Sequence, residues 1–246
     1  MSGSRETATF FPRPRAILSN GAIEQMTREQ VRALILETGI IPAIRTESMD
    51  DARFAAEAVF KGGIPILELT MTVPGALDLL TELRHKHPKS IVGAGTVLDE
   101  ETAARCLDAG AQFITSPGLD PAVIAFAHAK DIAMIPGALK PSEVMLALRS
   151  RVDFVKIFPC SLLGGPAYIK ALKAPFPEAP LIASGGVNQV TAKDYLNAGA
   201  PVLGIRGELI PKQAIEGRNE LWIHELAGRF LKIVKHHRDK HAVNQG

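Results

Sequence analysis

A lysine inside a short apolar stretch is the residue in this sequence best suited to covalent chemistry. Residues 153–158 combine β-branched and aromatic side chains and precede Pro159, which predicts a β-strand. Side chains alternate between the faces of a strand, so one face is expected to hold Val152, Phe154, Lys156 and Phe158. Burial disfavours the charged form of an amine, and a neutral amine attacks carbonyls to form Schiff bases. The alternative is a structural lysine whose ammonium group extends to water.

A glutamate occupies a similar place in an earlier stretch. Residues 64–69 predict a strand, and alternation places Glu68 on the same face as Ile66 and Thr70. If both strands belong to one barrel, they are the second and sixth, and their carboxylate and amine approach from opposite walls. A carboxyl group can then move protons while the amine holds a carbonyl carbon. A buried ion pair with only a structural role is the alternative.

These two stretches belong to a regular alternation of predicted strands and helices. The predicted strands cover residues 40–44, 64–69, 91–94, 112–115, 132–135, 153–158, 181–183 and 202–205. A further helix precedes the first strand and opens at Thr27 with a capping box to Gln30, and the last helix is predicted over 219–237. Eight strands alternating with helices predict an α/β fold, a single (β/α)8 TIM barrel with a leading N-terminal helix. No Gly-x-Gly-x-x-Gly follows the first strand, which argues against a dinucleotide-binding fold.

Composition bounds the class of protein. Of the 246 residues, 46% are hydrophobic, enough for a sizeable core, and residues 26–246 are expected to form one barrel domain. Residues 1–25 lack the continuous apolar segment of a secretory signal. They mix a Phe-Phe-Pro-Arg-Pro-Arg stretch at 10–15 with small polar residues and are expected to form a loosely ordered N-terminal extension. No apolar run approaches the roughly 18 residues needed to span a membrane.

Charge and metal-binding residue types exclude further classes. The net charge of +2, from 28 basic and 26 acidic residues, gives no reason to expect nucleic acid or a membrane as partner. Two cysteines, Cys106 and Cys160, provide no disulfide framework and are compatible with a reducing cytoplasm, where we expect the protein. The seven histidines show no ligand spacing, so neither a metal nor another cofactor is expected.

Polar or glycine-rich segments end the other predicted strands. Active sites of (β/α)8 barrels lie at the C-terminal ends of the strands, so these segments are expected to converge around Glu68 and Lys156. The turn at 184–186 offers backbone amides suited to an anion, with an ordinary turn as the alternative. A surface charge is the alternative for Arg45, and a simple turn for Thr96. The expected substrate-binding residues are Arg45, Thr96, Pro117, Phe158, Ser184, Gly185, Gly186, Arg206 and Gly207.

In these segments the chain resembles the 2-keto-3-deoxy-6-phosphogluconate (KDPG) / 4-hydroxy-2-oxoglutarate (KHG) aldolases, class I Schiff-base enzymes on a small barrel. The resemblance runs from about Val31 to the last helix. Six motifs in the family's order carry it: Leu-Glu-Leu-Thr at 67–70 with Thr-Val-Pro at 72–74, Val-Gly-Ala-Gly-Thr-Val at 92–97, Ser-Pro-Gly at 116–118, Ile-Pro-Gly at 135–137, Val-Lys-Ile-Phe-Pro at 155–159 and Ser-Gly-Gly-Val at 184–187.

The resemblance implies roles for individual residues. Lys156 matches the lysine that forms the Schiff base, and Glu68 matches the glutamate that acts as acid and base. Thr96 and Pro117 match residues that line the pyruvyl pocket. The resemblance also implies a lyase without a cofactor, a small 2-keto acid as substrate, and a homotrimer.

Three positions differ from the family's common pattern. Thr72 stands where many members carry an arginine that helps to bind the substrate carboxylate. Other members have threonine there and an arginine at the end of the first strand, as Arg45 is here. Carboxylate binding is therefore expected at Arg45. Ser184 replaces a threonine and keeps a hydroxyl. Arg206 and Gly207, followed by Glu208, replace a Gly-Ser pair that helps to hold phosphate. Arg206 is expected either to bind an anionic tail, oriented by Glu208, or to pair with Glu208 and leave the site to another tail.

Together these features favour a class I aldolase that cleaves a 2-keto-3-deoxy (phospho)sugar acid or 4-hydroxy-2-oxoglutarate to pyruvate and an aldehyde. One alternative is an aldolase-like barrel acting on an unphosphorylated or differently charged 2-keto acid. A second alternative is a phosphate-binding barrel isomerase or synthase, but that class gives no reason for a lysine within an apolar strand. A third is a non-catalytic binding barrel.

Overall fold

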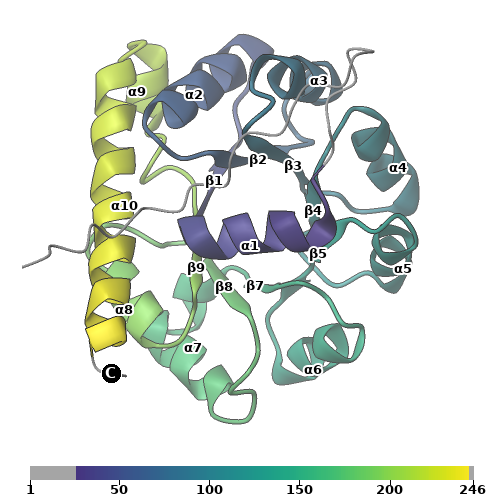
Figure 1. The fold of residues 1–246 in the computed structure, drawn as a ribbon, viewed down its shortest axis with the longest axis vertical. Helices are drawn as coiled ribbons and strands as arrows, with labels where there is room; N and C mark the ends of the chain where they lie inside the picture. Colours follow the sequence, from purple (N-terminus) through teal and green to yellow (C-terminus); the bar gives the residue numbers. More distant parts are fainter. Residues whose placement is uncertain (1–25, 244–246) are drawn as a thin grey trace, which may run out of the picture.

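The computed structural model describes residues 26–243, with side chains up to residue 240. The extension expected at residues 1–25 therefore lies outside the described residues. A ring of parallel strands occupies the centre of the molecule, and helices surround it (Figure 1). The expected (β/α)8 fold with a leading helix is confirmed.

The strands fall close to their predicted positions. They are β1 (Ile40–Ile44), β2 (Ile66–Thr70), β3 (Ile91–Gly95), β4 (Phe113–Thr115), β5 (Ala133–Ile135), β6 (Gly137–Ala138), β7 (Val155–Ile157), β8 (Leu181–Ser184) and β9 (Val202–Ile205). Their order in the sheet is β5-β4-β3-β2-β1-β9-β8-β7-β6, with every pair parallel.

The fifth predicted strand, residues 132–135, corresponds to β5, and a further short strand, β6, follows after Pro136. β5 pairs with β4, whereas β6 pairs with β7. β5 and β6 are the first and last strands in the sheet, and because they are consecutive in the chain they bring its two edges together. Proline has no N–H for a ladder hydrogen bond, but its carbonyl still accepts from the Lys156 amide at 2.9 Å. The ring is therefore nearly closed at this point, beside the lysine.

One end of the barrel is filled and covered by the leading helix. Inward-facing side chains form a separate apolar cluster, which includes Ile41, Ile66, Ile91, Phe113, Phe154, Ile182 and Val202. Helix α1 (Arg28–Thr38) adds Val31 and Ile35 to this cluster and lies across the ring (Figure 1). An ion pair between Arg28 and the buried Asp153, at 2.9 Å, fastens the start of the helix. The N-terminal end of the barrel is thus closed, which leaves the C-terminal ends of the strands for a site.

The remaining helices cover the outside of the ring. They are α2 (Met49–Lys61), α3 (Ala76–Lys86), α4 (Glu100–Asp108), α5 (Pro121–Ala129), α6 (Pro141–Arg149), α7 (Pro166–Lys173), α8 (Ala192–Asn197), α9 (Lys212–Glu216) and α10 (Glu220–Val243), with a 3-10 turn η1 at Cys160–Leu163. The capping box between Thr27 and Gln30 is confirmed. The sequence reading missed α9 and η1, and it placed Val152 on the wrong side, because β7 begins only at Val155 and Val152 packs in the outer core.

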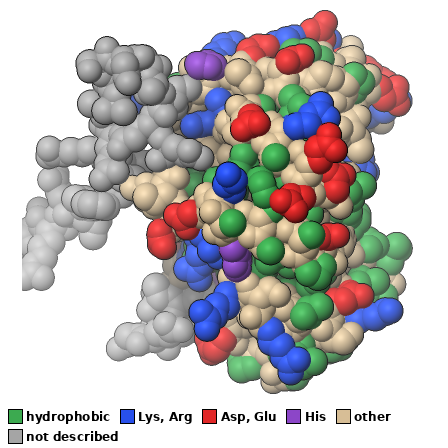
Figure 2. Space-filling model, turned by 90° about the vertical axis from the view of Figure 1, so that its right-hand side faces the viewer, with side chains coloured by type: hydrophobic (Ala, Val, Ile, Leu, Met, Phe, Trp, Pro, Cys, Tyr) green, Lys and Arg blue, Asp and Glu red, His purple; other side chains and the backbone are tan. Residues whose placement is uncertain are grey.

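The surface carries mixed charge. On the face drawn in Figure 2, acidic and basic side chains are interspersed, in keeping with the net charge of +2. Across the described helices, none combines the length and apolarity that crossing a membrane requires.

Candidate active site

Lys156 and Glu68 meet inside the open end of the barrel. The Lys156 Nζ atom lies 3.3 Å from Oε1 and 3.2 Å from Oε2 of Glu68. Their side chains are only 12% and 5% exposed, so the lysine does not extend into solvent. The two groups come from β7 and β2, on opposite sides of the ring order. An amine and a carboxyl group are thereby held within proton-transfer distance at the open end of the barrel.

A glycine on the neighbouring strand makes room for the carboxyl group. A Cβ atom at Gly95 of β3 would collide with the Oε1 atom of Glu68. Glu68 shares the inward direction of Ile66, which lies in the inner apolar cluster. Its inward position, expected from alternation, is confirmed, and the small neighbour explains how a carboxyl group fits there.

Phe158 connects the lysine to the glycine turn after β8. The Lys156 Nζ atom lies 5.7 Å from the centre of the Phe158 ring. Phe158 also approaches Gly185, where an added Cβ would be 3.2 Å from the ring atom Cδ2. Phe158 therefore lies near both Lys156 and Gly185.

Arg45 and Thr96 are joined across β2. The Arg45 Nη2 atom donates to the Thr96 hydroxyl at 3.1 Å, from the end of β1 to the end of β3. Thr96 adopts a backbone φ of 60°, a conformation that β-branched residues rarely take. Thr72 is engaged elsewhere, because its hydroxyl lies 2.9 Å from that of Thr70. Arg45 and Thr96 thus flank the strand that carries Glu68.

The glycine turn after β8 is separated from the next helix. Ser184 is buried and shares the inward face of Ile182, whereas Gly185 and Gly186 both have φ of 85°. Helix α8 starts only at Ala192, because Asn188 accepts hydrogen bonds from the amides of Val190 and Thr191 in a side-chain turn. An anion at the turn would therefore meet turn amides rather than a helix end.

Three predicted residues lie at the rim without contacting the central pair. Arg206, Gly207 and Pro117 are exposed, and no hydrogen bond or ion pair of the Arg206 side chain is found within residues 26–240. In the same range no ion pair joins Arg206 to Glu208, so the expected orientation by Glu208 is not found. A Cβ at Gly207 would meet no atom within 4 Å, so packing does not require glycine there.

One residue that the sequence reading passed over lies against the glycine turn. Ser161, in η1, donates its amide to the Gly185 carbonyl at 3.1 Å, and its hydroxyl contacts the position where Gly186 lacks a side chain. Its neighbour Cys160 is buried, and its Sγ lies 3.3 Å from the Tyr195 hydroxyl. Burial raises the pKa of the Cys160 thiol above its ordinary value, so this group is a structural contact. Ser161 and Gly185 are 24 positions apart in the sequence, so no local pattern indicates that they become neighbours in the fold.

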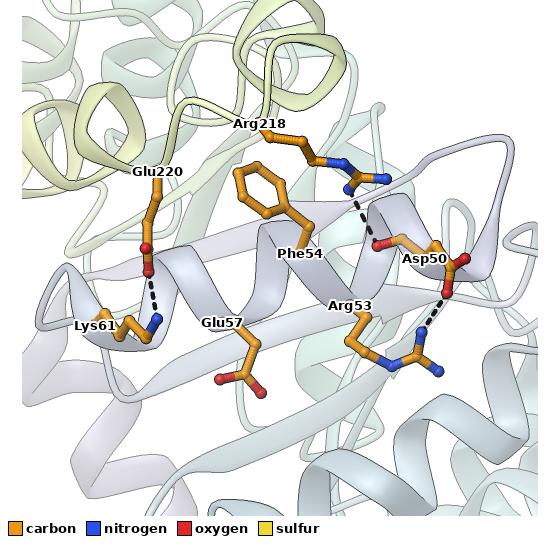
Figure 3. Close-up of a pocket in the computed structure, with 7 residues that line it drawn as sticks. All are labelled: Asp50, Arg53, Phe54, Glu57, Lys61, Arg218 and Glu220. Atoms are coloured by element: carbon orange, nitrogen blue, oxygen red, sulfur yellow. Dashed lines mark hydrogen bonds and ion pairs between the residues drawn. The ribbon is translucent and has the colours of Figure 1, made fainter.

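A hollow on the outside of the barrel gathers more charges than the strand ends do. It measures about 370 Å³ and lies between α2 and the start of α10, lined by Asp50, Arg53, Phe54, Glu57, Lys61, Arg218 and Glu220 (Figure 3). We call it the outer groove. Lys61 pairs with Glu220 at 2.7 Å, and Arg53 pairs with Glu82 at 2.8 Å. Within residues 26–240, no group of three His, Cys, Asp or Glu side chains is arranged to hold a metal ion.

Comparison with known proteins places the chain in a family. A family model for KDPG and KHG aldolase matches residues 31–226. The 2-dehydro-3-deoxy-phosphogluconate aldolase of Pseudomonas aeruginosa is 33% identical over 217 residues, which are 88% of this chain and 98% of that protein. The KHG/KDPG aldolase of Escherichia coli is 35% identical over 203 residues, 82% of this chain and 95% of the other.

Solved structures agree. The KDPG aldolase of Legionella pneumophila, with pyruvate captured as a covalent carbinolamine intermediate, superposes with a TM-score of 0.75 at 32% identity, covering 80% of this chain and 96% of that one. A thiamine phosphate pyrophosphorylase from Pyrococcus furiosus, at 12% identity and a TM-score of 0.65, shares the fold alone. With a family match over most of the barrel and an amine–carboxyl pair at its open end, this chain belongs to the KDPG/KHG aldolase family and is a class I aldolase, a lyase.

Proposed function

We propose that the protein cleaves a 2-keto-3-deoxy-6-phospho sugar acid to pyruvate and a phosphorylated three-carbon aldehyde through a Schiff base on Lys156. The observation that carries this proposal is the Lys156–Glu68 contact of 3.2 Å in a nearly closed, little-exposed part of the barrel mouth. The relatives named KDPG aldolases and the pyruvate adduct of the Legionella pneumophila enzyme support a 2-keto acid as substrate.

The first half of the reaction uses the pair as it stands. Glu68 takes a proton from the Lys156 ammonium group along their hydrogen bond, which leaves a neutral amine. The amine attacks the C2 carbonyl carbon of the substrate and forms a carbinolamine. Loss of the C2 hydroxyl as water, with a proton supplied by Glu68, gives a protonated imine that withdraws electrons from C3.

The second half breaks the carbon–carbon bond. Glu68, again ionised, takes the proton of the C4 hydroxyl while the C3–C4 electron pair moves toward the imine, and the aldehyde leaves. The enamine then recovers a proton at C3, and water hydrolyses the imine to release pyruvate and the free amine of Lys156. One carboxyl group serves both halves because it lies within reach of the imine nitrogen and its neighbours.

The head and the tail of the substrate have different partners. The guanidinium group of Arg45, already held by Thr96, is the proposed partner of the substrate carboxylate, since arginine binds carboxylates with two parallel donors. Pro117 and Phe158 are proposed to line the pyruvyl part. Ser184, Gly185, Gly186, Arg206 and Gly207 are proposed to receive the aldehyde tail, at adjacent strand ends since Ser184 pairs with Gly204.

Borohydride trapping tests the proposal directly. The protein is incubated with pyruvate and sodium borohydride, digested, and the modified peptide is located by mass spectrometry. The expected adduct is on Lys156, with the exposed Lys140 after β6 as an internal comparison. Cleavage of phosphorylated and unphosphorylated 2-keto-3-deoxy acids and of 4-hydroxy-2-oxoglutarate is then measured by pyruvate release. An adduct elsewhere, or none at all, would reject the mechanism; preference for an unphosphorylated acid would reject only the proposed tail.

We also propose that the chain assembles as a homotrimer. Support comes from family membership and from apolar side chains left on the surface of the single chain, such as Leu162, 80% exposed, and Val190, 84% exposed. Light scattering coupled to size-exclusion chromatography measures the mass, for which three times 26.4 kDa is expected.

A further inference from the structure

Ser161 places a hydroxyl group over the glycine turn that follows β8. Its side chain fills the space in which a Cβ of Gly186 would lie, and its amide is bonded to the Gly185 carbonyl at 3.1 Å. Cys160, the preceding residue, fixes the segment, because its Sγ contacts the Gly185 carbonyl at 3.4 Å and the Tyr195 hydroxyl at 3.3 Å. Ser161 is thus exposed yet fixed in position.

Phe158 approaches both the lysine and the turn that Ser161 contacts. The centre of the Phe158 ring lies 5.7 Å from the Lys156 amine, the ring also approaches Gly185, and the next residue, Gly186, contacts Ser161. A 2-keto acid bound to Lys156 through C2 has its pyruvyl carbons at the lysine and its tail beyond them. On the proposed function, the end of that tail is received at the glycine turn after β8, which Ser161 contacts.

The groups around Ser161 suit an anion. Its hydroxyl has no hydrogen-bond partner within residues 26–240, and in the same range no backbone acceptor is found for the amides of Gly186 and Gly207. Arg206 supplies a cation at the end of the adjacent strand. Unpaired donors and a guanidinium group at two neighbouring strand ends are groups of the kind that bind phosphate.

We propose that Ser161 is a specificity-determining residue of this aldolase, whose hydroxyl donates a hydrogen bond to the terminal phosphate of the substrate together with the Gly186 amide and Arg206. The inference rests on the proposed function and deepens it, because it names which unassigned group distinguishes a phosphorylated tail from a hydroxyl tail. A hydrogen bond to a charged oxygen is stronger than one to a neutral group, so the phosphorylated substrate benefits more from it.

The test compares two substrates in three proteins. The ratio of kcat/KM for a 6-phosphorylated 2-keto-3-deoxy acid to that for its unphosphorylated analogue is measured in the wild type, in Ser161→Ala and in Ser150→Ala. Ser150 is the matched control, because its hydroxyl binds only the Leu146 carbonyl at the end of α6. We expect the ratio to fall at least about tenfold in Ser161→Ala, equivalent to about 1.4 kcal/mol.

A second variant and a trapping control separate the possible failures. Ser161→Asp places a carboxylate against the phosphate and is expected to lower the ratio further than alanine does, because like charges repel. An unchanged ratio in Ser161→Ala, or undiminished use of the phosphorylated acid by Ser161→Asp, overturns the inference. If the wild type traps pyruvate on Lys156 in either case, the proposed function stands without it. If the wild type traps no pyruvate, the proposed function itself fails, and the assignment of Ser161 fails with it.

Discussion

The open end of the barrel and the outer groove both gather opposite charges, but in different surroundings. At the strand ends, Lys156 and Glu68 are 12% and 5% exposed. In the outer groove (Figure 3), the comparable pair Lys61 and Glu220 is 58% and 33% exposed. Water and salt screen the exposed pair, whereas electrostatic interactions are stronger where water is excluded.

The contrast shows that a hollow with many charges need not be a place for chemistry. Cations of the groove engage neighbouring carboxylates. The hydrogen bond from Lys61 lowers the pKa of Glu220, and the one from Arg53 lowers the pKa of Glu82, which lies beside the groove. Such pairs keep their groups ionised and occupied. The strand-end site has fewer charges, but its amine and carboxyl group are adjacent, sheltered and open to a ligand from one side only.

The largest expected difference between the two regions comes from their lysines. We expect Lys156→Ala to abolish both cleavage and pyruvate trapping, because no other described amine lies against Glu68. Lys61→Ala in the outer groove is the matched control and is expected to retain both activities. Circular dichroism checks that each variant is folded. A borohydride-stable pyruvate adduct in Lys156→Ala would place the nucleophile elsewhere, with Lys140 the next to test.

The carboxyl groups give the next largest contrast. Glu68→Gln is expected to trap pyruvate still but to exchange its methyl protons with solvent about 10²–10⁴ times more slowly, because a positioned proton-transfer group is lost. Glu220→Gln, in the outer groove, is expected to exchange at the wild-type rate. Proton exchange is followed by NMR in deuterated water. Equal rates in the two variants would reduce Glu68 to a structural partner of Lys156.

The arginines test the tail of the substrate. Arg206→Ala is expected to raise KM for a 6-phosphorylated substrate at least about tenfold, equivalent to about 1.4 kcal/mol, and to change little for the unphosphorylated analogue. Arg218→Ala removes a groove arginine that pairs with Asp51 at 3.0 Å and is expected to leave both KM values as they are. Steady-state kinetics on both substrates provide the measurement, and equal shifts for both substrates in Arg206→Ala would remove Arg206 from the tail site.

The smallest effect is a pH-dependent contribution of the groove to stability. Burial raises the pKa of Glu57, but the hydrogen bonds from His87 and Lys86 outweigh it and hold that pKa below its ordinary value. A carboxyl group with a lowered folded-state pKa stabilises the fold above its unfolded value of about 4.3 and loses this contribution as the pH falls through the folded value. Glu57→Gln should therefore cost about 0.2–1 kcal/mol at pH 7.

Urea unfolding at several pH values measures this cost. The difference in free energy of unfolding between the wild type and Glu57→Gln is expected to shrink as the pH falls below about 4, the region in which the carboxyl group becomes protonated. A difference that stays constant, or that grows toward acid, would show that the pairs of the outer groove do not act through the charge of Glu57.

Much of the barrel follows from local sequence patterns. Alternation placed Glu68 with Ile66 on the inner face, and the capping box placed the start of α1, because both depend on residues a few positions apart. The interruption at Pro136 was not predictable: a missing N–H marks a break, but only the β7 partner shows that the strand resumes at Gly137.

Contacts between distant segments could not be inferred from the chain alone. Arg45 and Thr96 are 51 positions apart, and their hydrogen bond depends on how two strand ends approach each other. Ser161 gives no local signal, since its relation to Gly186 exists only once η1 folds against the turn. Glu208 was expected beside Arg206 from strand alternation, which does not extend beyond the end of β9 at Ile205.

The backbone of Thr96 sets a limit on how this enzyme can be made more robust. A threonine at φ 60° occupies a conformation that costs of order 1–3 kcal/mol and that glycine adopts readily. Any design or selection for heat resistance alone would favour glycine at this position, and would thereby discard the hydroxyl that holds Arg45. If Arg45 binds the substrate carboxylate as proposed, stability and activity draw on the same residue, and thermostable variants of this barrel have to gain their stability elsewhere.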